Sequence, residues 1–510
     1  MQFAEKIVDA ALRSTGSTWI TQADLEAWMA SSNTGTMNDI IYGVHDGFLV
    51  SHKMDDGNTA YSTRHFHIAE NKIAENILRL QYVITSKQFQ ESLIDTLIDA
   101  FETEENDGRK LHFHQRDAVK MVCNNNVSVL TGGPGTGKTT VLSAITYCLR
   151  RLNDQVRIVF TAPTGKAAKR IVESTGEHAS TVHKKFGIKT ENSCISTFYE
   201  DALFIDESSM NDADLVAKIL SYIPDGRKVV FVGDTAQLPS VGPGAVLRDF
   251  ILSGVLPVTK LTHTFRQDNN STLHGNICNI RDGVPKFING DDFHAILLPQ
   301  GDQKRAACIH VRDVYLDQIQ KYGSDEVVVL IPYRRSGFCS NIMNNYLQKL
   351  VNKETSGYRY YDSNEKITIF FKKNDYVMQL INRDECANGD VGKVILVSNK
   401  GIKVQYSDCE VSYSPNELSQ LALAYSMTIH KSQGSEYKSV IMCFLDEHER
   451  MLQRNLLYTG ITRAKKECTV IYQQHALEVA CKTIADANRL TMLSEKLRAL
   501  RMQYKMLYGV

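Results

Sequence analysis

The sequence predicts an α/β protein with two parallel sheets, a small β-barrel inserted into the second sheet's domain, and a separate N-terminal unit. Two sets of short apolar runs alternate with helical stretches, and strands joined by helices pair in parallel. The first set is VSVLTG, RIVFTA, ALFID and KVVFVGD, and the second is EVVVLIPY, AYSMTIH, SVIMCF and CTVIYQ. The chain of 510 residues also exceeds what one hydrophobic core holds.

Residues 1–82 predict a winged-helix-like domain. Thr21 and Asp24 suit the start of a helix over 23–29, and MNDIIYGVHDG has apolar residues at helical spacing with a glycine where the helix ends. FLVSHK and TAYSTRHF are strand-like and flank the turn MDDGN. Two helices and a hairpin favour a winged helix, while a docking domain that touches no nucleic acid is equally compatible. Residues 67–82 predict a helix that leads into the next domain.

The rest of the chain divides into a linker, two α/β domains and an insertion. Residues 83–110 predict a helical linker, and residues 111–265 predict the first α/β domain. Residues 266–365 and 416–510 predict the second α/β domain. Between them, residues 366–415 are turn-rich and strand-like with few helix signals, which predicts the inserted β-barrel.

Composition excludes several classes of protein. Lys and Arg together number 58, as do Asp and Glu, so the chain does not coat nucleic acid through a bulk positive field. Basic residues gather instead in GKAAKR, HKK, PYRR and RAKK, which is typical of a focused groove. The nearest cysteines, Cys468 and Cys481, are too far apart for a metal motif, and we expect reduced thiols. The sequence has no apolar run near the roughly 20 residues of a membrane span and no signal-peptide core, so we expect a cytoplasmic protein without a membrane partner.

The segment LTGGPGTGKTT, residues 130–140, follows a predicted strand and matches a phosphate-binding P-loop. Its glycines let backbone N–H groups approach phosphates, and the helix that begins near Lys138 points its N-terminus at them. We expect Lys138 to reach the β and γ phosphates of ATP and Thr139 to ligate Mg²⁺. The predicted contacts of this segment are Gly132, Gly133, Pro134, Gly135, Thr136, Gly137, Lys138, Thr139 and Thr140.

Later strand ends supply further groups for the nucleotide. ALFIDESSM places Asp206 and Glu207 at the carboxyl end of a buried strand, where open sheets bind ligands. We expect Asp206 to hold Mg²⁺ through water and Glu207 to deprotonate the attacking water. In KVVFVGDTAQLPSVGPG, Gln237 lies in a loop that reaches the γ-phosphate. The donor and acceptor of Gln115 suit the adenine edge, although an ordinary surface position explains this residue equally well.

Nine ordered motifs resemble those of superfamily 1 helicases, in the wording of the RecD-like branch with its phage and bacterial members. They are LHFHQRDAV, LTGGPGTGKTT, TAPTGKAAKR, TVHKKFG, LFIDESSM, GDTAQLPSVGPG, THTFRQ, YSMTIHKSQGSEY and LLYTGITRAKK, within residues 111–475. The resemblance implies ATP-driven 5′-to-3′ movement along single-stranded DNA in a bacterial or phage-infected cell. It also implies two RecA-like domains with ATP bound between them, and an SH3-like fold for the inserted barrel.

The resemblance further implies roles for individual residues. Arg266 in THTFRQ and Arg463 in TGITRAKK stabilise charge on the transferred phosphoryl group, and Glu436 lies near the nucleotide. Arg334 and Arg335 match another basic element, whose ligand the resemblance leaves open. The implied DNA contacts are Thr161, Pro163, Thr164, Lys166, His183, Pro239, Ser240, Thr428, His430, Lys431, Ser432 and Gln433.

Two further features concern how a strand is gripped and separated. Tyr333, Tyr425, Phe186 and His430 are candidate stacking faces for bases, each worth about 1–3 kcal/mol if used, while most aromatic residues in such strands belong to the core. Only GIKTENSCISTFYE, residues 187–200, is left for the hairpin that splits duplex in relatives. This pin is shorter than the family pattern.

Other functions stay open at this level. A P-loop ATPase that remodels proteins would hydrolyse ATP regardless of DNA, and a non-catalytic DNA-binding subunit has no need of Lys138 and Glu207. The track is DNA or RNA, because no residue pattern here reads a 2′-hydroxyl. Replication, recombination and repair are all compatible. We expect a monomeric motor on single-stranded DNA and single-strand–duplex junctions, with the N-terminal domain available to a protein partner.

Overall fold

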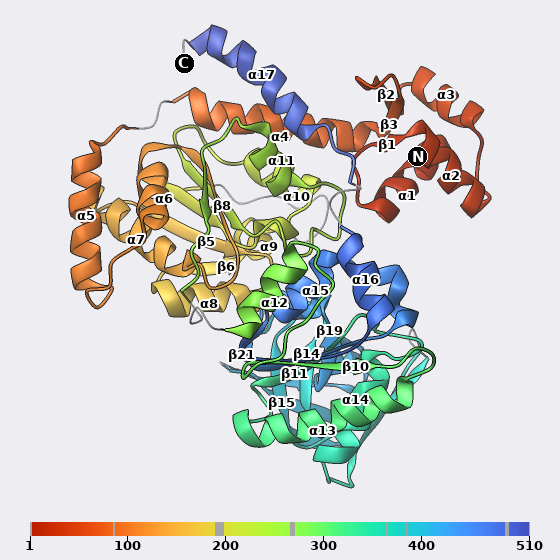
Figure 1. The fold of residues 1–510 in the computed structure, drawn as a ribbon. Coiled ribbons are helices and arrows are strands. Elements are labelled where there is room, and N and C mark those ends of the chain that lie inside the picture. The colour runs from red at the N-terminus through yellow and green to blue at the C-terminus, as the bar shows by residue number, and fades with distance from the viewer. Residues whose placement is uncertain are drawn as a thin grey trace.

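The computed structural model describes residues 3–84, 87–188, 198–265, 271–363, 366–383, 385–407, 409–484 and 489–508. Figure 1 shows a small N-terminal unit, a first α/β unit and a second α/β unit that carries an antiparallel β insertion. Helix α4 runs from the N-terminal unit along the first α/β unit. The C-terminal helix α17 lies beside α4 rather than with the second unit that precedes it in the sequence.

The N-terminal unit packs helices against a small antiparallel sheet. The helices are α1 (Phe3–Thr15), α2 (Gln22–Ser32) and α3 (Met37–His45). The strands, in the order β1-β3-β2, are Ile20–Thr21, Thr59–Thr63 and Leu49–Lys53. The predicted start of α2 is confirmed, because the Thr21 hydroxyl accepts the Asp24 N–H at 3.2 Å. The sequence pattern gives no prediction for α1, whose buried Val8 and Leu12 pack with Leu25 and Ile40.

Helix α4 (Arg64–Tyr82) begins before the predicted start at residue 67. The Thr63 hydroxyl accepts the Phe66 N–H at 3.3 Å, so TAYSTRHF is a strand only as far as Thr63. Apolar side chains of α4, including Ile73 and Ile77, join the buried cluster of the first α/β unit. Helix α4 therefore belongs to the core of the first unit as much as to the N-terminal unit.

A buried carboxylate on α4 joins the N-terminal unit to the C-terminal segment. Glu70 accepts hydrogen bonds from the Thr18 hydroxyl at 2.5 Å, the Trp19 indole N–H at 3.0 Å and the Met492 N–H at 3.1 Å. The Lys496 ammonium lies 3.1 Å from the same carboxylate. Lys496 belongs to α17 (Leu493–Tyr508), which packs on α4 and on α11 of the first α/β unit. The sequence grouped this segment with the second α/β unit because it follows that unit directly in the chain.

The predicted parallel sheet of the first α/β unit is confirmed. Its strands run parallel in the order β6-β5-β7-β8-β4-β9. They are β4 (Val127–Gly132), β5 (Ile158–Ala162), β6 (Ala179–Thr181), β7 (Ala202–Ile205), β8 (Lys228–Gly233) and β9 (Val258–Leu261). The helical segments are α5 (Glu91–Glu104), α6 (Phe113–Asn124), α7 (Lys138–Leu152), α8 (Gly165–Thr175), α9 (Val182–Lys185), η1 (Ser208–Met210), α10 (Ala213–Leu220) and α11 (Val246–Ser253). Among these strands, β6 and β9 are additions to those predicted.

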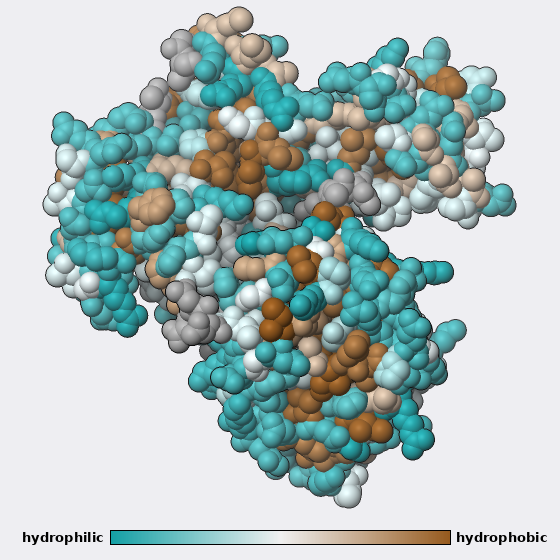
Figure 2. Space-filling model, viewed as in Figure 1, coloured by the Kyte–Doolittle hydropathy of each residue, from teal (hydrophilic) through white to brown (hydrophobic). Residues whose placement is uncertain are grey.

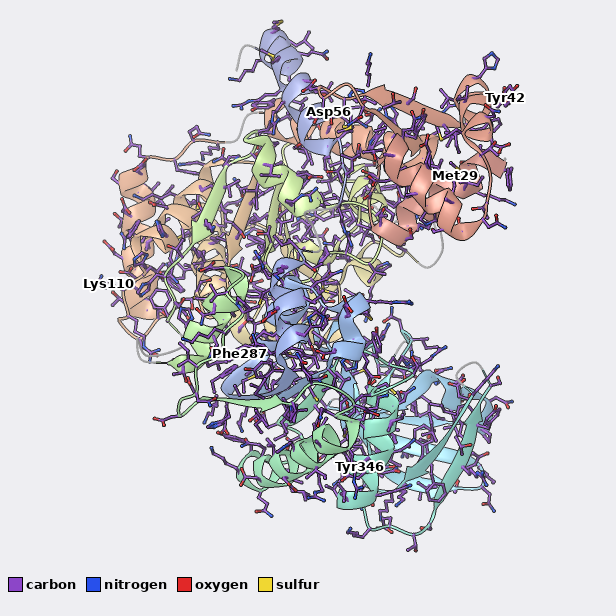
Figure 3. All side chains as sticks on the ribbon, turned by 45° about the vertical axis from the view of Figure 1, so that its right-hand side comes forward. Met29, Tyr42, Asp56, Lys110, Phe287 and Tyr346 are labelled. Atoms are coloured by element: carbon purple, nitrogen blue, oxygen red, sulfur yellow. The ribbon has the colours of Figure 1, made fainter. Side chains whose placement is uncertain are left out.

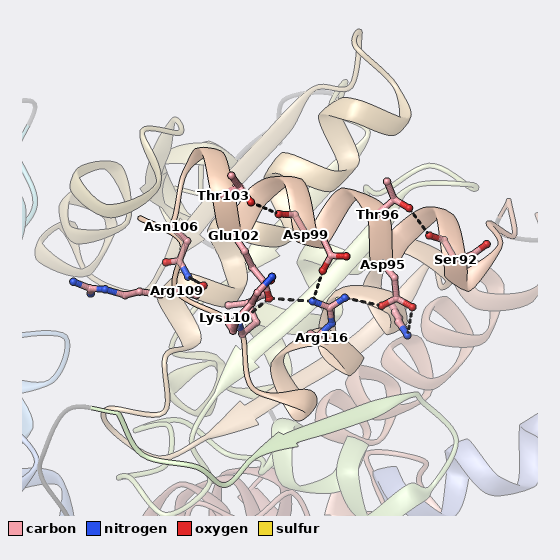
Figure 4. Close-up of polar contacts among 12 residues, drawn as sticks. Ser92, Asp95, Thr96, Asp99, Glu102, Thr103, Asn106, Arg109, Lys110 and Arg116 are labelled. Carbon is pink, nitrogen blue, oxygen red and sulfur yellow. Dashed lines mark hydrogen bonds and ion pairs between the residues drawn. The ribbon is translucent and has the colours of Figure 1, made fainter.

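An arginine of α6 fixes α5 to the body of this unit. Arg116 contacts Asp95 at 3.1 Å, Asp99 at 2.9 Å and Glu102 at 3.0 Å (Figure 4). Glu102 also accepts the Leu111 N–H at 2.8 Å, just before α6 begins. These contacts hold the start of α6, which carries Gln115, in a defined position behind the P-loop.

The second α/β unit is also built on a parallel sheet, as predicted. Its strand order is β10-β21-β20-β11-β19. The strands are β10 (Phe293–Leu298), β11 (Val327–Ile331), β19 (Ser426–Thr428), β20 (Tyr437–Phe444) and β21 (Ala464–Gln473). The helical segments are α12 (Thr272–Arg281), α13 (Lys304–Tyr322), α14 (Ser340–Val351), η3 (His430–Ser432), η4 (Asp446–Met451), α15 (Arg454–Ile461) and α16 (Gln474–Lys482).

An antiparallel insertion interrupts the second unit between α14 and β19. It comprises the hairpin β12 (Gly357–Asp362) and β13 (Ile367–Lys372), followed by a sheet in the order β17-β16-β15-β14-β18. The sheet strands are β14 (Tyr376–Gln379), β15 (Val391–Ser398), β16 (Gly401–Gln405), β17 (Glu410–Tyr413) and β18 (Leu421–Leu423), with η2 (Pro415–Gln420) before β18. Antiparallel pairing thus extends beyond the predicted limits 366 and 415, because β12 and β18 each pair with a strand between them.

On the face of the molecule that Figure 2 shows, hydrophilic residues predominate. Figure 2 shows apolar side chains gathered over parts of both α/β units on the face in view. Figure 3 places Met29 and Tyr42 on the N-terminal unit at one end of the molecule and Tyr346 on the second α/β unit toward the other end. In the described part of the chain, no helix combines the length and apolar character that crossing a membrane requires.

We expect Glu70→Ala to lower the free energy of unfolding of the N-terminal unit by about 3–5 kcal/mol, because it leaves the buried Lys496 ammonium without its carboxylate. Urea unfolding followed by tryptophan fluorescence measures this, since both tryptophans, Trp19 and Trp28, lie in that unit. Glu75→Ala removes an exposed carboxylate from the same helix and is the matched control. Equal losses in the two variants would contradict the role of the buried cluster.

Candidate nucleotide site and nucleic-acid groove

The P-loop connects β4 to the start of α7. Gly135 and Gly137 have φ values of 73° and 76°, which favour glycine, and a Cβ on Gly137 would lie 2.4 Å from the Gln115 amide nitrogen. The Lys138 ammonium donates to the carbonyls of Gly132 at 2.6 Å and Gly133 at 3.0 Å. The loop is therefore wrapped closely around the lysine expected to bind phosphate.

Two carboxylates follow β7 at its carboxyl end, where the sequence predicted them. The Asp206 N–H donates to the Thr161 carbonyl at 2.8 Å, which continues the pairing with β5. Glu207 has φ 49° and ψ 41°, a left-handed conformation that is strained for a residue with a side chain. Burial raises the pKa of Asp206, and the neighbouring Glu207 carboxylate raises it further. Two acidic groups are thus held together at a cost in stability, which is typical of functional sites.

The end of β8 carries a third acidic group toward the second α/β unit. Asp234 accepts a hydrogen bond from the Tyr458 hydroxyl of α15 at 2.8 Å. Burial raises the pKa of Asp234, while the nearby Lys138 charge opposes the rise. Three residues after Asp234, the Gln237 carbonyl accepts a hydrogen bond from the Asn455 amide at 3.0 Å. The loop after β8 is therefore fastened to the second unit.

Arg463 completes this junction from the second unit. Its guanidinium donates to the Gln237 side-chain oxygen at 3.0 Å, and it also donates to the carbonyls of Thr459 at 3.1 Å and Ser435 at 3.2 Å. Only 3% of Arg463 is exposed. Burial lowers the pKa of its guanidinium, and the carboxylates of Glu207 and Glu436 oppose this effect. The sequence predicted Gln237 and Arg463 beside one phosphate, and the structure brings the two side chains into contact.

These groups surround one cavity of about 550 Å³ between the two α/β units. The predicted residues that line it are Gly133, Pro134, Gly135, Thr136, Gly137, Lys138, Thr139, Asp206, Glu207, Gln237, Glu436 and Arg463. The lining also includes Arg170, Lys465 and Phe265, which sequence reasoning missed. The basic runs GKAAKR and RAKK contain the first two, so their charge was visible but their direction was not. Arg266 lies outside the described residues.

Gln115 lies behind the P-loop rather than in the lining of this cavity. Its side-chain oxygen accepts the His112 N–H at 2.9 Å, and its amide donates to the Thr136 carbonyl at 3.3 Å. Both ends of the amide are therefore engaged within the protein, in a position that supports the P-loop. The adenine contact stays a prediction.

The donor set at the carboxylate end suits a hard divalent cation such as Mg²⁺. The Thr139 side chain and the Asp206 carboxylate line the same cavity and offer oxygen ligands. Among the described residues, no group of three or more His, Cys, Asp and Glu side chains gathers as a self-sufficient metal cage. A magnesium ion here would therefore be shared with the phosphates of the substrate, as is usual for this cation.

A second cavity, of about 560 Å³, lies between the second α/β unit, the loop after β8 and the N-terminal unit. The predicted DNA contacts that line it are Pro239, Ser240, Thr428, His430 and Lys431. Arg334 lines it too, and so do Arg13, Gly16 and Arg489, from segments not predicted here. The described lining contains no Asp or Glu. Of the four basic runs predicted to form a groove, PYRR alone contributes to this lining, through Arg334, whereas GKAAKR and RAKK contribute Arg170 and Lys465 to the nucleotide cavity.

A third cavity, of about 940 Å³, continues on the first α/β unit. Pro163, His183 and Gln433, three further predicted DNA contacts, line it together with side chains of α4 and α10. Pro239 and Val241 border both this cavity and the previous one, and 86% of Val241 is exposed. The two cavities therefore adjoin at Pro239 and Val241.

Comparisons with known proteins agree with this arrangement. Residues 110–295 match the family described as an AAA domain, and residues 423–471 match the UvrD-like helicase C-terminal domain. The chain is 31% identical over 448 residues to the ATP-dependent RecD2 DNA helicase of Deinococcus radiodurans, which covers 83% of this chain and 59% of that one. It is 28% identical over 429 residues to the RecBCD enzyme subunit RecD of Mycolicibacterium smegmatis, covering 75% and 74%. Over most of its length the chain is therefore similar to proteins named RecD2 and RecD.

Solved structures similar to this chain include two Pif1 helicases. Bacteroides Pif1 bound to single-stranded DNA has a TM-score of 0.44 and 18% identity, with 79% of this chain and 97% of that chain covered. Pif1 helicase from Candida albicans has a TM-score of 0.45 and 20% identity, with 78% and 100% covered. The chain spans 59% of the length of its Deinococcus relative.

Some predicted DNA contacts are corrected by the structure. Thr161 is fully buried in β5 and its hydroxyl donates to the Phe204 carbonyl at 3.1 Å, so its side chain faces the sheet. Ser432 is also fully buried, and its hydroxyl donates to the Ile429 carbonyl at 2.7 Å. Ser240, by contrast, borders the groove, and its hydroxyl donates to the Gly242 carbonyl at 2.8 Å, so its DNA contact stays a prediction. Small hydroxyl side chains next to strand ends often form hydrogen bonds to nearby backbone carbonyls in this way.

Two of the candidate stacking faces belong to the core. Tyr425 is buried, and its hydroxyl donates to Asp375 at 2.8 Å. Phe186 is buried and stacks on Phe198. His430 borders the groove and Tyr333 is half-buried beside His448, so both stay predictions. Of the predicted pin, residues 189–197 lie outside the described part of the chain.

Thr164 and Lys166 lie where the two α/β units meet. The Thr164 hydroxyl accepts the Ala167 N–H at 3.2 Å and begins α8. A Cβ on Gly434 of the second unit would lie 2.7 Å from that hydroxyl. The Lys166 ammonium lies 4.6 Å from the centre of the Tyr437 ring. In this conformation both residues contact the opposite unit.

The raised pKa of Asp206 makes a prediction about stability. A folded-state pKa above the unfolded value gives stability at low pH that is lost as pH rises through the folded-state pKa, so ionised Asp206 destabilises the fold at neutral pH. Asp206→Asn is therefore expected to raise stability at pH 7 by an amount on the order of 1–3 kcal/mol. The gain should shrink as pH falls, because protonation then neutralises the wild-type carboxyl as well. Thermal unfolding across a pH series measures it.

Asp201, at the other end of β7, is the matched control. Burial alone would raise the pKa of Asp201, but hydrogen bonds and charge from Arg157 and Arg227 lower it overall. Asp201→Asn is therefore expected to reduce stability at pH 7, opposite in sign to Asp206→Asn. If both variants lose stability, the burial cost assigned to Asp206 is wrong.

Proposed function

We propose that this protein is an ATP-dependent DNA helicase that moves 5′-to-3′ along single-stranded DNA and unwinds duplex, in replication, recombination or repair. The observation that carries the proposal is the hydrogen bond from Arg463 to Gln237 inside a cavity that also contains Lys138, Asp206 and Glu207. Two separate units contribute to one triphosphate site, so events at that site change how the units sit against each other. The names of the RecD-like relatives support the same activity.

The residues of the cavity divide the work of hydrolysis. Lys138 and the P-loop N–H groups bind the phosphates, and Glu207 accepts the proton of the attacking water. Thr139 and Asp206 hold Mg²⁺, which neutralises phosphate charge when bound. Gln237 positions the γ end, and Arg463, with Arg266 as a second proposed arginine, stabilises the charge that develops there. Because Arg463 comes from the second unit, charge at the γ position draws that unit toward the first.

The groove residues grip the strand and move with these units. Thr428, His430 and Lys431 belong to the second unit, whereas Pro163, His183 and Pro239 belong to the first. Closure and opening therefore change the distance between two grips on one strand. Opening one base-pair step costs on average about 1.4 kcal/mol of stacking, a small load for a motor driven by ATP.

We also propose identities for the accessory parts. The helices and antiparallel hairpin of the N-terminal unit support a winged-helix-like domain, and the antiparallel sheet after β13 supports an SH3-like insertion in a RecA-like second domain. The motor is proposed to act as a cytoplasmic monomer on single-stranded DNA and junctions. The outer face of the N-terminal unit is left for a protein partner.

Polarity is tested with duplexes that carry either a 5′ or a 3′ single-stranded tail. We expect ATP-dependent unwinding of the 5′-tailed duplex only, because movement toward the 3′ end of the loading strand then meets the junction. Lys138→Ala is expected to abolish this activity and DNA-stimulated hydrolysis while single-strand binding stays measurable, since that lysine lies in the nucleotide cavity and not in the groove. Unwinding of only the 3′-tailed substrate would refute the direction, and full activity of Lys138→Ala would refute the site.

Lys431 tests the groove. Its ammonium donates to Asn388 at 3.1 Å, and burial, together with the Arg334 charge, lowers its pKa. A phosphate contact releases counterions, so Lys431→Ala is expected to weaken binding and reduce the slope of log affinity against log salt by about 0.7. Fluorescence anisotropy of a labelled oligonucleotide at several salt concentrations measures this. Lys438→Ala is the control, because Lys438 pairs with Glu326 away from the groove, and an equal change in both variants would count against the assignment.

A further inference from the structure

Helix α8 connects the contact between the two α/β units to the nucleotide cavity. Thr164 precedes its first residue and packs against Gly434 of the second unit, and Lys166 in its first turn lies beside Tyr437. Arg170 and most of the residues that follow it in α8 line the nucleotide cavity. One helix of 11 residues therefore contacts the second unit at one end and lines the nucleotide cavity at the other. A displacement of Arg170 would therefore also move the end of the helix that contacts the second unit.

Arg170 forms an ion pair across the cavity. Its guanidinium lies 3.0 Å from the Glu436 carboxylate, and Glu436 belongs to the second unit. Lys465, also from the second unit, lies 3.5 Å from the same carboxylate. The Glu436 side chain is only 10% exposed, whereas the Arg170 side chain is 36% exposed. Two cations therefore share one carboxylate at the wall of a site built for a polyanion.

The position of Arg170 points to the terminal-phosphate end of the site. Arg170 lines the same cavity as Asp206, the carboxylate proposed to hold magnesium, and Arg463, the arginine proposed to contact the γ-phosphate. Burial raises the pKa of Asp206 and lowers that of Arg463; the Arg170 charge opposes the first shift and adds to the second. A bound triphosphate adds several negative charges at this end. The paired N–H groups of arginine bind phosphate in a bidentate manner, and the terminal phosphate carries more negative charge than the single Glu436 carboxylate.

We propose that Arg170 is a nucleotide-sensing residue, which Glu436 holds in the structure described here and which transfers to the terminal phosphate of ATP. The transfer releases one tie between the units at the cavity and moves α8, so that its Thr164 end changes its contact with the second unit. The inference rests on the proposed function, because it takes ATP as the ligand of this cavity. It assigns to Arg170 the task of distinguishing ATP from ADP.

Binding of fluorescent mant-ATP and mant-ADP to the full chain tests the proposal. For Arg170→Ala we expect mant-ATP affinity to fall by about tenfold or more, the effect of one charge-assisted contact, and mant-ADP affinity to change by less than about twofold. By linkage, any loss in the influence of single-stranded DNA on ATP affinity should be matched by an equal loss in the influence of ATP on single-strand affinity. Arg170→Lys keeps a charge and should restore much of the preference for ATP. Lys169→Ala is the matched control, because Lys169 is the adjacent cation of α8 and donates to Ser407 of the insertion at 2.9 Å.

A double variant that exchanges the two charges of the ion pair distinguishes a nucleotide-sensing role of Arg170 from a purely structural ion pair. In Arg170→Glu combined with Glu436→Arg, the ion pair can form again, but position 170 of α8 no longer presents a cation to the cavity. Continued loss of mant-ATP binding in this double variant supports the proposal, and full recovery overturns it. An unchanged ATP preference in Arg170→Ala also overturns it, provided that the wild type binds both nucleotides. Failure of the wild type to bind mant-ATP would remove the proposed function itself, and this inference with it.

Discussion

The structure depends on one buried guanidinium. Arg463 is almost completely enclosed, and a charge in such a place is stable only when several acceptors surround it. Those acceptors come from both α/β units, namely the Thr459 and Ser435 carbonyls on its own side and Gln237 on the other. The junction of the units is therefore defined at the same atoms that would meet the end of a triphosphate. A change in the ligand bound at this site would therefore also change the contact between the two α/β units.

The acidic groups on the first unit complement this arginine. Burial raises the pKa values of Asp206 and Asp234, and the strained backbone of Glu207 holds a third carboxylate close to the first. Such a cluster disfavours its own ionisation and favours any cation that enters, whether a metal, the Lys138 ammonium or an arginine from the second unit. The unfavourable proximity of these carboxylates therefore gives the site affinity for the cations that the proposed hydrolysis requires.

The remote parts of the chain are attached to this junction through the loop after β8. Arg489 of the C-terminal segment donates to the Ser240 carbonyl at 2.6 Å and the Gly244 carbonyl at 2.8 Å, and the Gly244 N–H donates to the Gly16 carbonyl at 2.9 Å. With the Glu70 cluster, these bonds place the N-terminal unit against the wall of the positive groove. The same loop places Gln237 in the nucleotide cavity and Ser240 and Gly244 in contact with Arg489 and Gly16. These contacts hold the N-terminal unit at the border of the groove.

The sequence by itself determined the two parallel sheets, the P-loop, the acidic strand ends and the position of Gln237. These features follow from local patterns. Alternating strands and helices form a parallel sheet, and a glycine-rich loop before a helix forms a phosphate-binding site. It did not determine that α17 packs on α4, that the hydroxyls of Thr161 and Ser432 bond to backbone carbonyls, or that Arg170 lines the cavity that contains the P-loop. Each of those outcomes depends on contacts between residues far apart in the chain, and neither periodicity nor motif spacing records which side of a helix a distant unit will cover. Only the tertiary structure, by burying Arg463 between units, decided which charges meet.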